Sequence, residues 1–345
     1  MSITNKHHKS HKSIFSEKSI GSIKKSGLYE VWFTMLNKIE TGESFWIRYT
    51  LLIPKQTNRN LQGNGLLWFG YTNQNKPQEN FMIKKFYPIE EVHETTSNYI
   101  IKIADSLLTI SSLDGAFQTE SGKNVFWDLE LSEFMDPYIS TPYLAKRLRI
   151  TDTLNYATHP NVRIDGIIRI DNTEVRINKS PGIQYHTFGE AYTTPWEWIS
   201  AHTFSGKPSA YLDLGYKVDK GIVEIFDGSR SLTSWNSNVI SKLRMSKKIQ
   251  RIYTETQLKF SLHTKSVDLT GNISCEKENL LGVEYLGPKG GRFYCYNTAL
   301  ANLEAKFHSK NHEFNESITG SVAFETVYTE PINGIPYLPW EAEYI

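Results

Sequence analysis

Short strand-like segments separated by turn signals recur along almost the whole chain. Leu28–Leu36 and Ser44–Ile53 are rich in the aromatic and β-branched residues that favour strands. In Ser44–Ile53 the residues alternate so that one face is consistently apolar, as in a strand with one buried side. Turn-forming Asp-Gly pairs occur at residues 114–115, 165–166 and 227–228. Further strand-like segments lie at 65–71, 99–103, 106–110, 124–131, 164–170, 197–204, 210–214, 221–226, 249–263, 281–286 and 317–328.

This pattern predicts an all-β protein made of antiparallel barrels or sandwiches, with few short helices. Helical periodicity is weak, and we expect helices only at Pro142–Ile150 and Ser237–Ser246. A chain of 345 residues exceeds what one hydrophobic core usually fills, so two domains are expected. The pair His159-Pro160 interrupts the strand pattern. We therefore predict one β domain at residues 27–160 and a second at residues 161–345.

Composition and charge exclude several classes of protein. The chain has 38 Lys and Arg against 37 Asp and Glu, and this balance argues against a dedicated nucleic-acid-binding protein. Residues 1–26 carry six Lys, three His and one Glu without an apolar core, so we predict a disordered basic tail and no signal peptide. Neither an apolar run of membrane-spanning length nor enough cysteines for a disulfide framework is present. We expect a cytoplasmic protein.

One stretch concentrates residues capable of chemistry. Residues 181–204 combine two histidines, two glycines, two tryptophans and several other aromatics. Shortly afterwards comes Ala210–Leu214, which alternates like a strand. In a strand Tyr211 and Asp213 project from the same face, with Leu212 and Leu214 opposite. The alternation alone leaves open whether Asp213 faces solvent or an aromatic-lined interior.

The order of these motifs resembles that of a known superfamily. Gly182-x-x-x-His186-x-Phe188-Gly189, then Trp196-x-Trp198 and Tyr211-x-Asp213, are similar to the second half of the carotenoid hydratase, tocopherol cyclase and AttH superfamily. Its first half is similar to Tyr29–Trp32, Phe45–Thr50, Leu67–Phe69 and Trp127–Leu129. The resemblance covers roughly residues 27–330. It implies two lipocalin-like antiparallel β-barrel domains.

The resemblance also implies which residues act. The positions that match the proposed catalytic groups of the hydratases are His186, Phe188, Tyr211 and Asp213, with Trp68 as the match for an early tryptophan. Phe188 departs from the family pattern, because the hydratases carry Trp there. We predict Asp213, His186 and Tyr211 as catalytic residues. The predicted ligand-binding residues are Phe188, Trp196, Trp198, Tyr185 and Trp68.

The chemistry expected of such a site is protonation of an alkene. Burial keeps a carboxyl group protonated by raising its pKa, so Asp213 would be the acid. His186 or Tyr211 would orient it or later accept a proton. Aromatic faces would stabilise the carbocation by cation–π attraction, and water or an internal hydroxyl would capture it. Neither a cofactor nor a metal is needed for these steps.

Two classes of function follow from this reading. The first is a cofactor-independent enzyme that hydrates, cyclises or isomerises a hydrophobic isoprenoid-like or polyketide-like molecule. The second is a lipocalin-like protein that binds such a ligand without changing it. A buried Asp213 favours the enzyme, and a solvent-facing one favours the binding protein. Arg48 is expected to pair with Glu30 across the hairpin, with a ligand carboxylate as the alternative.

The sequence leaves other partners open. The basic tail at residues 1–26 suggests peripheral contact with an anionic membrane surface. No nucleic-acid partner is expected. Neither the identity of the ligand nor the oligomeric state follows from the residues.

Overall fold

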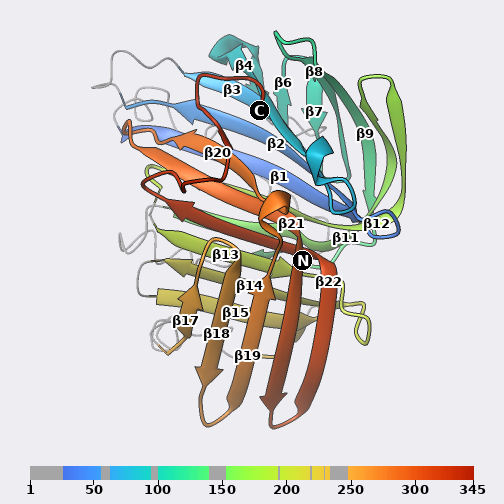
Figure 1. Cartoon of the computed structure of the whole chain (residues 1–345), viewed down its shortest axis with the longest axis vertical. Helices are drawn as coiled ribbons and strands as arrows, with labels where there is room; N and C mark the ends of the chain where they lie inside the picture. Colours follow the sequence, from blue (N-terminus) through green and yellow to red (C-terminus); the bar gives the residue numbers. More distant parts are fainter. Residues whose placement is uncertain are drawn as a thin grey trace.

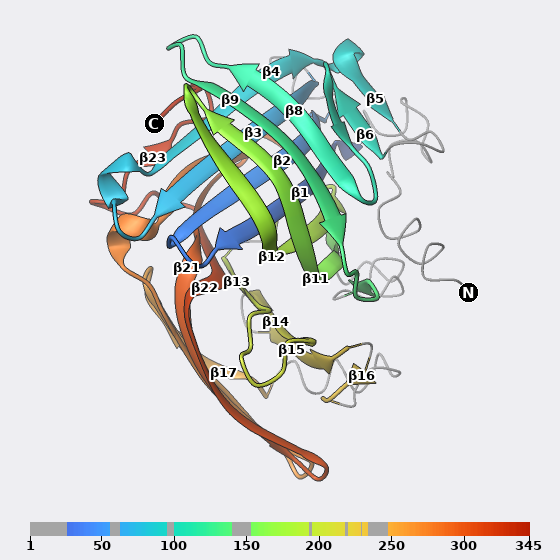
Figure 2. The same ribbon diagram turned by 90° about the vertical axis from the view of Figure 1, so that its right-hand side faces the viewer.

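The computed structural model describes residues 26–55, 63–94, 100–139, 153–192, 195–217, 220–228, 230–233 and 248–345. Its regular structure is almost entirely antiparallel strand, arranged in two curled sheets (Figures 1 and 2). One sheet forms a nearly closed barrel and the other a half-barrel, which confirms the predicted all-β architecture. The basic tail, apart from Ser26, and the two helices predicted at 142–150 and 237–246 lie outside the described residues.

The first sheet contains twelve strands within the described residues. Its main order is β4-β3-β2-β1-β12-β11-β9-β8-β7-β6-β5, and β10 pairs with β11. Two short 3-10 turns, η1 (Pro77–Glu79) and η2 (Ile89–Glu91), connect its strands. The strands are β1 (Leu28–Lys38), β2 (Glu43–Ile53), β3 (Asn64–Asn73), β4 (Phe81–Pro88), β5 (Val92–Glu94), β6 (Ile101–Ile103), β7 (Ser106–Leu108), β8 (Ser112–Gln118), β9 (Asn124–Ser132), β10 (Tyr138–Ile139), β11 (Thr153–Ile170) and β12 (Thr173–Gly189).

The second sheet contains eleven strands within the described residues, in the main order β16-β15-β14-β13-β22-β21-β19-β18-β17. β20 pairs with both β21 and β23, and the turn η3 (Lys277–Asn279) precedes it. The strands are β13 (Trp196–Ala201), β14 (Ala210–Lys217), β15 (Lys220–Asp227), β16 (Arg230–Ser231), β17 (Gln250–Tyr253), β18 (Gln257–His263), β19 (Val267–Ser274), β20 (Leu281–Leu286), β21 (Arg292–Ser309), β22 (His312–Tyr328) and β23 (Tyr337–Leu338).

The chain passes from the first sheet to the second between Gly189 and Trp196. β11 and β12 form a long hairpin that belongs to the first sheet, and residues 160 and 161 fall inside β11. The change of sheet therefore comes later in the chain than the predicted division at 160/161. The division into domains itself stays a prediction, because a sheet is not the same as an independently folding unit.

Three apolar clusters hold the sheets together. One fills the interior of the first sheet and includes Trp32, and a second fills the curl of the second sheet and includes Leu212. The third lies between the two sheets, and we call it the intersheet layer. Alternation along β1 sends Trp32 into the first cluster and Phe33 towards the intersheet layer. The buried members of the intersheet layer are Tyr29, Val31, Met35, Trp46, Leu52, Leu66, Trp68, Met82, Tyr138, Ala157, Ile183, Tyr185, Tyr211, Phe226, Leu281, Val283, Tyr285, Leu286, Cys295, Ala299, Ala323, Val327 and Leu338.

The C-terminal segment ties the two sheets together. β23 pairs in parallel with β20 of the second sheet, and the residues after it run along β4 of the first (dark red in Figure 1). The Lys84 amide donates to the Glu343 carbonyl at 2.9 Å, and the Ile345 amide donates to the Met82 carbonyl at 3.1 Å. The segment thereby covers an edge strand that would otherwise present unpaired backbone groups.

Lys84 is the buried charge beneath this segment. It has no accessible surface, and its Nζ donates to the Pro339 carbonyl at 2.7 Å. The Nζ atom also lies 4.8 Å from the ring centre of Trp68 and 5.0 Å from that of Trp340. Burial lowers the pKa of Lys84 to about 7.

We expect the free energy of unfolding to rise with pH above about 7 because of Lys84. Between this folded pKa and the ordinary lysine value, the unfolded chain binds a proton that the folded chain does not. The gain is about 1.4 kcal/mol per pH unit from this group. Urea unfolding at pH 7.5 and 8.5 measures it, and Lys84→Met should remove that part of the slope. Lys85→Met, on the neighbouring residue, is the control. Equal slopes for the wild type and Lys84→Met would contradict the prediction.

Candidate active site

Asp213 lies on β14 with its side chain in the intersheet layer. Tyr211 projects from the same face, whereas Leu212 and Leu214 belong to the core of the second sheet, as the alternation predicts. The side chain is buried, with Asp213 only 4% exposed. Asp213 therefore faces an aromatic-rich interior and not solvent.

Two neutral donors hold one oxygen of Asp213. The Tyr185 hydroxyl donates to Oδ1 at 3.0 Å, and Trp198 Nε1 donates to the same atom at 2.9 Å. Tyr185 comes from β12 of the first sheet and Trp198 from β13 of the second. Ser200 Oγ lies 3.3 Å from the Tyr185 hydroxyl. The carboxyl group is thus positioned by both sheets at once.

A second acid lies beside Asp213. Glu224 of β15 is its direct partner in the antiparallel register, so the two side chains leave the sheet on the same face. Glu224 has no accessible surface, and its Oε2 accepts a hydrogen bond from Thr233 Oγ1 at 2.8 Å. Sequence reasoning missed Glu224. The available signal was the hairpin of the two predicted strands at 210–214 and 221–226, whose register brings the two acids opposite each other.

Three tyrosines surround the two acids and stay neutral. Burial, with the nearby carboxylates, raises the pKa values of Tyr185, Tyr211 and Tyr138 well above the ordinary phenol value. Tyr211 stacks on Phe226, with ring centres 4.8 Å apart and an interplanar angle of 2°. Its buried hydroxyl has no hydrogen-bond partner among the described residues. These phenols can donate hydrogen bonds and offer aromatic faces, but they are poor bases.

Open space adjoins Asp213. Gly215 follows it on the same face of β14, and a Cβ atom built there would meet no atom within 4 Å. Phe33, Trp198 and Ile222 also point into the gap between the sheets and yet keep accessible surface. A side chain added at Gly215 would therefore have free space around it, two residues along β14 from the acid.

His186 and Phe188 lie on the other face of β12. His186 is the register partner of Trp32, stacks on its ring at 4.6 Å and has its Nε2 2.9 Å from Glu30 Oε1. Both His186 and Glu30 are fully buried. Adjacent residues of a strand point to opposite faces, so the structure does not bring His186 or Phe188 together with Asp213. Their roles stay predictions, and a catalytic His186 would act on the other side of the sheet.

The remaining predicted residues are in the intersheet layer. Trp196 Nε1 donates to Glu325 Oε1 at 2.6 Å, and Trp68 lies on β3 between the side chains of Arg48 and Lys84. Arg48 does not pair with Glu30, because Glu30 faces His186 on the opposite side of the sheet; that expectation was wrong. Six of the eight predicted site residues share the intersheet layer: Asp213, Tyr211, Tyr185, Trp196, Trp198 and Trp68.

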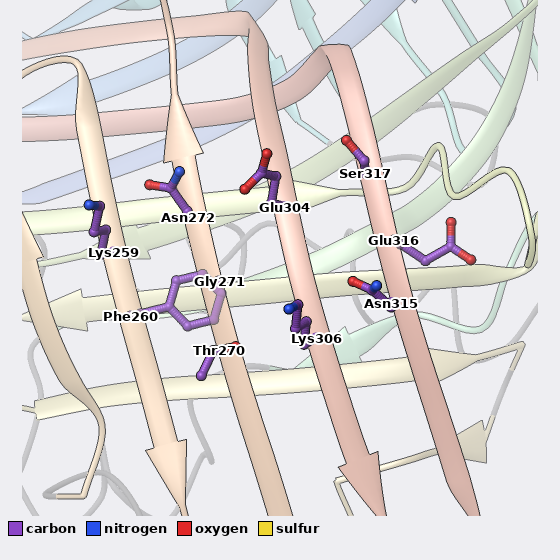
Figure 3. Close-up of a pocket in the computed structure, with 10 residues that line it drawn as sticks. All are labelled: Lys259, Phe260, Thr270, Gly271, Asn272, Glu304, Lys306, Asn315, Glu316 and Ser317. Carbon is purple, nitrogen blue, oxygen red and sulfur yellow. The ribbon is translucent and has the colours of Figure 1, made fainter.

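A separate groove of about 550 Å³ lies on strands β18, β19, β21 and β22 (Figure 3). Its outward side chains include Lys259, Glu304 and Lys306, which alternate with residues of the second core. The ring of Phe260 lies beneath Gly271, where a Cβ atom would clash with it at 2.2 Å. The groove contains none of the predicted site residues.

Two other kinds of site were sought in the described part of the chain. It contains no group of three or more His, Cys, Asp or Glu side chains that could hold a metal ion. No helix among the same residues has the length and hydropathy needed to span a bilayer.

Sequence comparisons find no relative. No family model matches the chain, and no curated protein matches it either.

Solved structures do resemble it. The crystal structure of CghA with Sch210972 aligns with a TM-score of 0.51 and 5% identity, over 87% of this chain and 88% of that one. Kievitone hydratase from Nectria haematococca aligns at 0.46 and 10% identity, over 86% and 88% of the two chains. A putative AttH from Nitrosomonas europaea aligns at 0.47 and 9% identity, over 92% and 97%. At this identity the CghA alignment shows a similarity of fold alone.

Proposed function

We propose that this protein is a cofactor-independent enzyme that hydrates, cyclises or isomerises a hydrophobic isoprenoid-like or polyketide-like molecule, with Asp213 as the acid. The observation that carries the proposal is the position of Asp213. It is buried in an aromatic layer, oriented by two donors, and next to open space.

Burial of the acid favours chemistry over simple binding. Placing a carboxyl group in an apolar layer lowers the stability of the folded protein. A carrier of hydrophobic molecules gains nothing from such a group. Glu224 opposite Asp213 adds to this cost, because like charges facing each other across two strands repel. Such a pair of facing acids is a structural feature that a catalytic site can use and that simple binding of a hydrophobic molecule does not need.

The reaction follows from the groups around the acid. Asp213 transfers its proton to one alkene carbon, and the positive charge develops on the neighbouring carbon. The faces of Trp198, Tyr185 and Phe33 stabilise this charge by about 2 kcal/mol where they are desolvated. Water that adds to the cation returns its extra proton to the Asp213 carboxylate and gives the hydrated product. A hydroxyl of the substrate that adds and returns its proton in the same way gives a ring, and loss of a carbon-bound proton to Asp213 gives an isomer.

The shared fold supports a small-molecule ligand. CghA, whose fold is similar, was crystallised with Sch210972. The substrate class of the present chain is inferred from its aromatic site and from the family resemblance, and not from that ligand.

Asp213→Asn should lower turnover by at least a hundredfold while leaving the fold intact, because an amide cannot supply the proton. Prenylated phenols and linear polyenes are the substrates to screen, with products identified by mass spectrometry. In D2O the wild-type product should carry one deuterium on the protonated carbon. Asp268→Asn, an exposed acid on β19, is the matched control.

Unchanged turnover by Asp213→Asn, or a product without deuterium, would show that Asp213 is not the acid. Recovery of a bound but chemically unaltered molecule from the wild-type protein would favour the binding function instead.

Gly215→Leu should abolish turnover without loss of stability. The added side chain enters the open space beside Asp213, and Gly215 has no positive φ that a leucine would strain. A melting temperature within a few degrees of the wild type, together with loss of product, is the expected result. Ser261→Leu is the control, because Ser261 lies on the outer face of β18 and the new side chain is added away from the site. Gly122→Ala would not serve, because the φ angle of Gly122 is +90° and would strain an alanine. Full activity of Gly215→Leu would place the substrate elsewhere.

A further inference from the structure

Arg48 is a buried cation without an acidic partner. It lies on β2 in the intersheet layer, is 5% exposed, and donates from Nε to Thr50 Oγ1 at 2.9 Å. Among the described residues, no carboxylate forms an ion pair with it. Its guanidinium carbon lies 4.3 Å from the ring centre of Tyr285, 5.4 Å from that of Trp68 and 5.6 Å from that of Trp46.

The neighbours of Arg48 compensate its charge only in part. Cation–π contacts with these rings offset part of the free energy lost when a charge is removed from water, but not all of it. The nearest acid that influences Arg48 is Glu325, and burial raises the pKa of that carboxyl group. Glu325 is also held by Trp196 Nε1 at 2.6 Å. One of its oxygens is therefore already engaged by Trp196, and no ion pair joins it to Arg48 among the described residues.

The rings around Arg48 carry unused hydrogen-bond donors. Trp46 Nε1, Trp68 Nε1 and the Tyr285 hydroxyl are buried and have no hydrogen-bond partner among the described residues. Burial raises the pKa of Tyr285 well above its ordinary value, so its hydroxyl keeps its proton. Buried polar groups are rarely left unpaired in folded proteins. A buried cation beside two indole N–H groups that have no hydrogen-bond partner among the described residues matches an anionic oxygen.

We propose that Arg48, Trp46, Trp68 and Tyr285 bind a carboxylate of the substrate, so that the substrate is a hydrophobic acid. This inference rests on the proposed function, because it takes the reacting end of the molecule to lie at Asp213. The indole N–H groups and the tyrosine hydroxyl donate to the carboxylate oxygens, and Arg48 supplies the opposite charge.

The register of the first sheet fixes the span between the two ends. Phe33 of β1 is the partner of Arg48 on one side and of Tyr185 on the other. Two strand spacings separate Arg48 and Tyr185, or about 10 Å between their backbones. Tyr185 donates to Asp213, and Phe33 between them keeps accessible surface. The apolar body of the substrate would lie over Phe33, with its carboxylate at Arg48 and its alkene at Asp213.

Two probes that differ in one group test the carboxylate site. All-trans-retinoic acid and all-trans-retinol have the same isoprenoid skeleton, and only the first carries a carboxylate. Titration by tryptophan fluorescence at pH 7.5 should give at least tenfold tighter binding of the acid. Arg48→Met should remove this preference by weakening the acid at least tenfold, with the affinity for retinol changed less than twofold.

Two further variants control for folding and general charge. Arg169→Met removes a half-exposed arginine of β11 and should leave the preference for the acid intact. Trp68→Phe keeps an aromatic side chain but removes the N–H together with part of the indole ring, so it should weaken binding of the acid about threefold or more and weaken retinol by less than the acid. The comparison of acid and alcohol on the wild type needs no variant and stands even where Arg48→Met fails to fold.

The outcomes separate this inference from the proposed function. Equal affinity for both probes, binding of neither, or an acid preference that survives in Arg48→Met overturns the carboxylate site. Asp213→Asn should keep the acid preference, since it alters the other end of the site. A preference for retinoic acid that depends on Arg48 supports the carboxylate site, whatever Asp213→Asn does to turnover. Unchanged turnover by Asp213→Asn would overturn only the role of Asp213.

Discussion

Burial of the first sheet on both faces is the constraint on which the rest of the structure depends. The central strands β1 and β2 are buried along almost their whole length, because one face covers the core of the first sheet and the other meets the second sheet. Such strands have no solvent face to which a polar side chain can turn. Each buried polar group must therefore pair within the protein or have a ligand as its partner.

The intersheet layer holds several charged side chains, and Glu325 is one of them, near Arg48. Arg48 and Lys84 lie at one end, over the rings of Trp68 and its neighbours, and Asp213 and Glu224 lie at the other. Between them are aromatic side chains and phenols that burial keeps neutral. An elongated molecule with an acidic end and an alkene is complementary to this order. A symmetrical hydrocarbon would satisfy neither the cation nor the unused donors.

The sequence predicted those features that depend on a single strand. Alternation placed Tyr211 and Asp213 on one face, and the turn signals identified an all-β chain. It failed where a site depends on the face of a neighbouring residue or on pairing between distant strands. The grouping of His186 with Asp213 came from the family resemblance, and it stays a prediction; alternation along β12 directs His186 and Tyr185 to opposite faces of the first sheet. The side chains that lie opposite Glu224 and Arg48 depend on strand register, of β15 with β14 for Glu224 and of β2 with β1 for Arg48.

The position of the acid also depends on how the sheets pack. Asp213 Oδ1 accepts one hydrogen bond from each sheet, so neither sheet alone can orient it. The C-terminal segment connects the same two sheets, through β20 on one side and β4 on the other. Contacts of that segment far from Asp213 therefore bear on the geometry of the site, because any shift of one sheet against the other lengthens one of the two bonds. A change that weakens the packing of the two sheets is therefore expected to disturb the geometry around Asp213 as well.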